Sequence, residues 1–124
     1  MANAISLTAA AVLTHDGVEV LNKAIASDLE FTVSGDGLIW HSQQIGTSEE
    51  AIDLGGLSTL GWAFFINVDP TNFIELRTGT GGTKFAKLQA NGGFALLRLG
   101  SGITAPYAIA DTAACWMRYA IVEV

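Results

Sequence analysis

The sequence predicts an all-β protein, folded as a single antiparallel β-sandwich with little helix. From Leu38 to the C-terminus, apolar residues alternate with other residues, as they do in strands that bury one face. Glycine-rich turn sequences recur at short spacing, for example at 34–37 and 79–83, which is typical of sandwiches and barrels. No segment carries a sustained apolar repeat of 3.6 residues with capping residues, so helix is expected to be minor.

The chain of 124 residues is expected to form one domain over residues 1–124. Residues 1–14 are apolar but interrupted by polar residues, so they are too short and too polar for a transmembrane helix. We expect them to form the first strand or an N-terminal arm. Residues 18–28 fit either a short helical turn or a twisted strand, and the sequence leaves both open.

The segment 54–77 contains the clearest pair of strands. Trp62 and Phe64 share one face of the first strand and Phe65 lies on the other, which predicts burial on both sides. Residues 68–72, Val-Asp-Pro-Thr-Asn, have turn chemistry because proline fixes φ and the Asp and Asn side chains can bond nearby backbone. The chain then returns as the second strand of a hairpin.

The closing strand places Trp116 and Arg118 on one face and Cys115 and Met117 on the other. Because Arg118 stands among apolar neighbours, we expect it to be an ion-pair partner at the rim or an interface contact. Ten strands are expected in all: Ile5–Thr14, Leu29–Ser34, Leu38–Ile45, Glu50–Leu54, Gly61–Val68, Phe73–Arg77, Phe85–Leu88, Phe94–Leu99, Tyr107–Ala110 and Ala114–Glu123.

The composition predicts contact between subunits. Only 15% of the residues are charged, against about 25% in typical domains, and a small domain cannot bury so much apolar material inside itself. The alternative is that the many Ala and Gly residues inflate the apolar fraction. The candidate residues for the subunit interface or the core are Trp62, Phe64, Phe65, Trp116 and Arg118.

The charge pattern argues against two classes of partner. The formal net charge is −6 and no basic run occurs, which excludes a typical nucleic-acid-binding protein and a basic membrane-surface helix. The one cysteine, Cys115, cannot form an intrachain disulfide and is expected to be a buried, inert thiol. The N-terminus lacks the positively charged region of an export signal, so we expect cytoplasmic synthesis.

No motif predicts a catalytic, cofactor-binding or metal site. Residues 79–84 have glycines and a lysine, but not in the order of a phosphate-binding loop, so a hairpin loop is expected. His15 and His41 match neither a hydrolase triad nor a zinc-site spacing. The turn aspartates lack the spacing of a calcium loop. An aromatic platform for sugars, built from Trp40, Trp62 and Trp116 with Tyr107, is an alternative to a core or interface role of the tryptophans.

Five segments together resemble small virion structural proteins of tailed bacteriophages. In that family a strand, an asparagine-rich turn and a strand precede a strand ending in Arg-Leu, then an Ala-Asp-Thr-Ala turn. The segments that carry the resemblance are Ala51–Gly55, Gly61–Leu76, Phe85–Leu88, Gly93–Leu99 and Ala108–Ala114.

The resemblance covers roughly residues 45–124 and implies a jelly-roll-like β-sandwich that is commonly trimeric. Such proteins are capsid decoration (cement) proteins or tail and fibre components. No catalytic residue carries over, so a non-enzymatic protein without a cofactor is expected. The expected partners are a second and third copy of the chain and the major capsid protein or another virion protein, which places the chain in the phage particle.

The N-terminal segment suits an arm that adds a strand to the sheet edge of a capsid partner. The candidate contact residues of this arm are Ile5, Leu7, Val12 and Leu13. The alternative function is a tail or fibre component, or a module that binds a carbohydrate or receptor through exposed aromatic side chains.

Overall fold

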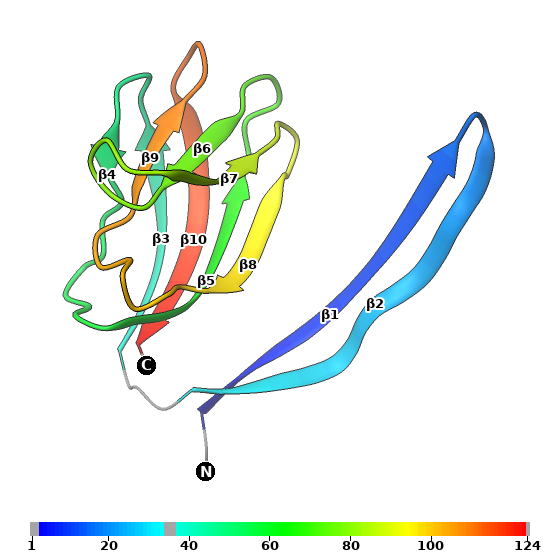
Figure 1. Cartoon of the computed structure of the whole chain (residues 1–124), viewed down its shortest axis with the longest axis horizontal. Helices are drawn as coiled ribbons and strands as arrows, with labels where there is room; N and C mark the ends of the chain where they lie inside the picture. The colour runs from blue at the N-terminus through cyan, green and yellow to red at the C-terminus, as the bar shows by residue number, and fades with distance from the viewer. Residues whose placement is uncertain (1–2, 34–36, 124) are drawn as a thin grey trace. The chain divides into compact units, whose positions relative to one another are not determined.

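The protein is all-β, as predicted, and Figure 1 shows its computed structural model. The model describes the backbone of residues 3–33 and 37–123, and the side chains of residues 16–19 and 37–123; no helix occurs in these residues. The chain divides into two compact units, Met1–Ser34 and Gly35–Val124.

The first unit is one long β-hairpin. Strands β1 (Asn3–His15) and β2 (Val18–Val33) pair antiparallel and form a two-stranded sheet of their own. Asp16 and Gly17 join them with φ values of 51° and 77°, the positive values that a two-residue hairpin turn of type I′ requires. Residues 18–28 are therefore strand, the second of the two possibilities that the sequence left open.

The second unit contains eight strands. They are β3 (Leu38–Ile45), β4 (Glu50–Ala51), β5 (Leu60–Asn67), β6 (Ile74–Arg77), β7 (Lys84–Leu88), β8 (Phe94–Arg98), β9 (Tyr107–Ala110) and β10 (Cys115–Glu123). They form two antiparallel four-stranded sheets, β3-β10-β5-β8 and β4-β9-β6-β7 (Figure 1). We expected one sandwich over residues 1–124; the strands of these two sheets all lie within 38–123.

The pairing of the eight strands is nested. The innermost pair, β6 with β7, is followed outwards by β5 with β8, β4 with β9 and β3 with β10. Successive pairs belong alternately to the two sheets, and the contacts of β10 with β5 and of β6 with β9 complete each sheet. In the second unit, each strand from β3 to β6 therefore pairs with the strand at the mirrored position in the order β10 to β7.

The core lies between the two sheets. Phe65, Met117 and Tyr119 from one sheet and Leu76 and Leu88 from the other are fully buried in a single hydrophobic cluster. Phe65, Met117 and Tyr119 occupy alternate positions of their strands, in keeping with the period-two pattern of the sequence.

Strand β5 is buried on one face only. Ala63 and Phe65 lie in the core, whereas Trp62, Phe64 and Ile66 are half-buried. The expectation that both faces are buried was wrong, because the core cluster of the described residues lies on the Ala63 and Phe65 side of β5 and the other face is only half-buried.

One buried polar side chain holds the turns at one end of the sandwich. The Asn67 amide nitrogen donates to the carbonyl oxygens of Asn72 (2.7 Å) and Leu88 (3.1 Å), and its oxygen accepts from the Asp69 N–H (2.9 Å). The Asp69 carboxylate accepts in turn from the N–H groups of Asn72 and Thr71. These bonds, that of Asn72 first, hold the pKa of Asp69 below its usual range.

Candidate functional site

The outer face of β3-β10-β5-β8 is the most unusual surface of the second unit. The strand register aligns Trp40, Ala120, Phe64 and Leu96 in one row across the four strands. We call this surface the aromatic face. Its residues are Leu38, Trp40, Ser42, Gln44, Trp62, Phe64, Ile66, Phe94, Leu96, Arg98, Trp116, Arg118, Ala120 and Val122.

Large apolar side chains of the aromatic face are exposed. The exposed fractions are 69% for Trp40, 63% for Leu38, 61% for Phe94 and 51% for Trp116. The Phe94 ring lies 6.1 Å from that of Phe64, so the aromatic groups adjoin one another across strands. Single exposed apolar residues are ordinary, but a contiguous patch of this kind marks a binding surface.

The charges of the aromatic face are all of one sign. Its two charged residues are Arg98 and Arg118, and neither guanidinium lies within ion-pair distance of a carboxylate in the described part of the chain. Enrichment in Trp, Phe and Arg with depletion of Lys, Asp and Glu is the composition of protein interfaces. The aromatic face therefore has the chemistry of a protein contact.

The opposite outer face, on β4-β9-β6-β7, is an ordinary solvated surface. Glu75 pairs with Lys84 at 3.2 Å, and the Lys87 ammonium lies 3.9 Å from the centre of the Phe73 ring. Opposite charges are interspersed there, as on most soluble proteins. The aromatic face is thus a local feature of one sheet and not a property of the whole surface.

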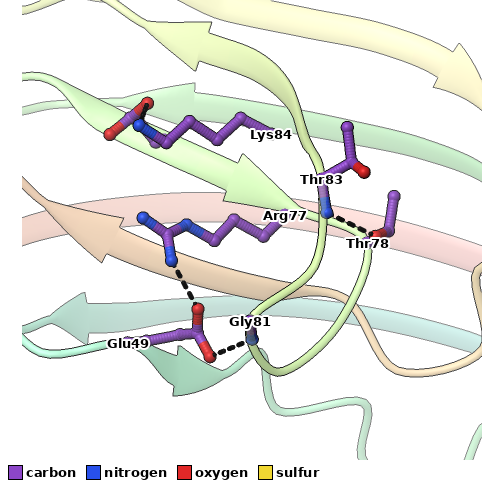
Figure 2. Close-up of polar contacts among 7 residues, drawn as sticks. Glu49, Arg77, Thr78, Gly81, Thr83 and Lys84 are labelled. Atoms are coloured by element: carbon purple, nitrogen blue, oxygen red, sulfur yellow. Dashed lines mark hydrogen bonds and ion pairs between the residues drawn. The ribbon is translucent and has the colours of Figure 1, made fainter.

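The loop 78–83 has a different structure from a phosphate-binding loop. The Glu49 carboxylate accepts from the Gly81 N–H (2.7 Å) and from Arg77 (2.6 Å), and the Thr83 N–H donates to the Thr78 hydroxyl (Figure 2). The Gly81 bond first and the Arg77 bond second lower the pKa of Glu49. Because a carboxylate of the protein already occupies a loop amide, an anionic ligand would have to displace it.

The Cys115 thiol and the Tyr119 side chain are both buried in the core of the second unit. Cys115 is fully buried, and burial, followed by the charges of Asp69 and Asp111, raises the pKa of its thiol. Burial raises the pKa of Tyr119 to about 12, and its hydroxyl donates to the Asp53 carbonyl oxygen. Among the described residues, no group of three or more His, Cys, Asp or Glu side chains could hold a metal ion.

One open cavity of about 280 Å³ lies where β8 ends. Its lining includes Arg98 and the hydroxyl-bearing residues Ser58, Thr59, Ser101 and Thr104, together with Leu60 and Ile103. The lining contains no histidine, cysteine or carboxylate that could act as a nucleophile or base. Nothing in it points to a particular ligand.

The residues predicted for an interface or core separate into two groups. Trp62, Phe64, Trp116 and Arg118 lie together on the aromatic face, whereas Phe65 lies in the core. The proposed arm residues Ile5, Leu7, Val12 and Leu13 all belong to β1, and their side chains lie outside the described residues.

Leu38, Phe94, Leu96 and Arg98 were not among the residues predicted for a site, and Trp40 was predicted to have a core or interface role, with sugar binding as the alternative. Alternation along β3 and β8 signals that these residues share faces. Only the strand order joins those faces to β10 and β5.

No protein-family model, curated protein or solved structure matches the chain. No helix in the described residues is long and apolar enough to cross a membrane.

Proposed function

We propose that the chain is a non-enzymatic structural protein of a tailed-phage virion, a capsid decoration protein that binds major capsid subunits as a homotrimer. The observation that carries the proposal is the aromatic face. An apolar sheet face of this composition is costly to leave in water and is suited to a permanent protein contact.

The strand order of the second unit supports a jelly roll, the architecture expected for such a protein. A jelly roll is a double-sheet sandwich of eight strands, an architecture found in viral capsid and lectin domains. The second unit has eight strands in two sheets, with nested pairing that alternates between the sheets. We propose that it is a jelly roll.

The proposed mechanism is adhesive. Each copy makes a modest contact with the shell, and trimerisation multiplies these contacts over a symmetric lattice, so that avidity replaces high pairwise affinity. From the sequence we expected the aromatic residues to join subunits and the arm to contact the capsid.

The charge on the aromatic face favours the reverse assignment. Two aromatic faces packed against each other would bring their Arg98 and Arg118 guanidinium groups together without a carboxylate. A capsid surface that supplies carboxylates satisfies the same arginines. We therefore propose the aromatic face as the capsid contact.

The proposal is tested by adding the purified protein to phage shells that lack it and then applying heat or osmotic shock. Decorated shells are expected to retain their DNA under conditions that burst bare shells. Arg118→Glu is the matched variant, since it leaves the core untouched and is expected to abolish the protection. Protection that is absent with the wild-type protein, or unchanged in the variant, contradicts the proposal.

Carbohydrate binding is the second candidate, because Trp40 and Trp116 are exposed on one sheet face beside the polar residues Gln44 and Ser42. Aromatic side chains of this kind stack on sugar rings. Binding of cell-surface glycans, lost in Trp40→Ala with the fold intact, would favour this function and a place in the tail or fibre.

A further inference from the structure

We propose that the β1–β2 hairpin is the subunit interface: hairpins of different copies pack against one another through one apolar face. This inference rests on the proposed homo-oligomer and names the contact that holds it together.

The register of the hairpin separates apolar from polar residues in its open half, residues 3–7 and 29–33. Ile5 pairs with Phe31 and Leu7 with Leu29, while Ser6 pairs with Glu30. Because alternate residues of a strand lie on opposite faces, one face of this half is apolar except for the uncharged Asn3 at its end. We call it the apolar hairpin face, and its residues are Asn3, Ile5, Leu7, Leu29, Phe31 and Val33.

A two-stranded hairpin is at best marginally stable in water by itself and needs a layer packed on its apolar face. Neither β1 nor β2 pairs with a strand of the second unit. A large apolar side chain buries on the order of 100 Å², so the apolar hairpin face supplies on the order of 500 Å² per copy. Standard interfaces bury about 800 Å² per partner, so the face provides much of what a stable contact requires.

The lack of charged residues on the apolar hairpin face favours a second copy of the chain as the partner that covers it. The apolar hairpin face contains no charged residue, so the same face of another copy can cover it without burying a charge. Glu30 and Thr32 occupy positions on the opposite face. The aromatic face differs in this respect, because Arg118 lies at its centre.

The test compares two adjacent substitutions on opposite faces of β2 in the full-length protein. Phe31→Lys is expected to raise the dissociation constant at least about a hundredfold, since ammonium groups would be buried together. It should therefore reduce the mass in sedimentation equilibrium to 13.0 kDa at micromolar concentration. Thr32→Lys adds the same charge one residue away and is expected to leave the mass of the oligomer unchanged.

A mixing experiment identifies the occupant. Phe31→Lys and Phe31→Asp are each expected to be monomeric alone and to associate when mixed, because opposite charges then meet across the contact. All three tryptophans lie in the second unit, so their fluorescence shows whether the sandwich remains folded in every variant.

Loss of mass in Phe31→Lys only, with recovery on mixing, supports the inference. The inference is overturned if Phe31→Lys keeps the wild-type mass, if Thr32→Lys dissociates as well, or if mixing restores nothing, since the hairpin would then bind another surface. A monomeric wild-type protein also overturns it. Decoration of the capsid is decided separately by locating the chain on the particle.

Discussion

At the scale of single residues, Asn67 is the polar side chain on which the end of the sandwich depends. It is fully buried, and it bonds backbone groups on both sides of the 67–72 turn and on the strand β7. A buried amide that meets its donors and acceptors locally stabilises one arrangement of the turns. Its loss leaves several backbone groups without partners.

Asn67→Ala is expected to lower the free energy of unfolding by about 1–3 kcal/mol, because the carbonyl groups of Asn72 and Leu88 lose their donor. Urea denaturation followed by tryptophan fluorescence measures the change. Gln89→Ala, at an exposed position next to Leu88, serves as the control and is expected to stay within about 0.5 kcal/mol of wild type. Equal stability of both variants would contradict this role for Asn67.

Asp69 is expected to make stability depend on pH. Its pKa is lower in the folded than in the unfolded state, so the ionised carboxylate stabilises the fold above the unfolded value of about 4. The contribution is lost as the pH falls through the lower folded value. Asp69→Asn should therefore be less stable than wild type at pH 7, and the difference should shrink below pH 4. A difference that is constant from pH 7 to pH 3 would rule this out.

At the scale of elements, the two faces of β10 have different roles: one packs in the core and the other belongs to the aromatic face. It pairs with both β3 and β5, and its residues alternate between full burial and exposure. Met117 is in the core, while its neighbour Trp116 is on the aromatic face with half of its surface exposed. The same strand thus contributes to the core on one side and to the proposed capsid contact on the other.

Met117→Ala is expected to destabilise the fold by about 2–5 kcal/mol, because it leaves a cavity between the sheets. Trp116→Ala is expected to change stability by less than about 1 kcal/mol and to weaken binding to phage particles in a co-sedimentation assay. The two substitutions are adjacent, so each is the control for the other. Full binding by Trp116→Ala would remove the aromatic face as the contact surface.

The alternation within elements is what the sequence predicts well. The opposite placement of Phe65 and Trp62 follows from period two alone, and so does that of Met117 and Trp116. The sequence does not predict which faces of β3, β5, β8 and β10 share one surface, because that depends on the order of strands far apart in the chain. That β1 and β2 join neither four-stranded sheet is likewise a matter of strand order and not of local alternation.

At the scale of the whole molecule, the two units present two apolar surfaces of different charge. The aromatic face carries Arg98 and Arg118, whereas the apolar hairpin face carries no charge. Two surfaces of this kind fit two different contacts, one with a partner that supplies carboxylates and one between copies.

The purified protein is expected to be a homotrimer, with a mass of about three times 13.0 kDa in light scattering at micromolar concentration. Association buries the apolar hairpin face, so the trimer should persist at high salt, where surface ion pairs are screened. A single species of 13.0 kDa over the whole concentration range would exclude a trimer in solution.

The location of the chain in the virion tests the central claim most directly. Purified phage particles are imaged by electron microscopy, and the eight-stranded sandwich is fitted into the reconstructed density. We expect the chain at symmetry-related positions on the outer shell, with the aromatic face turned toward major capsid subunits. Density for the chain only on the tail, or no chain in the particle, would contradict the assignment as a capsid decoration protein.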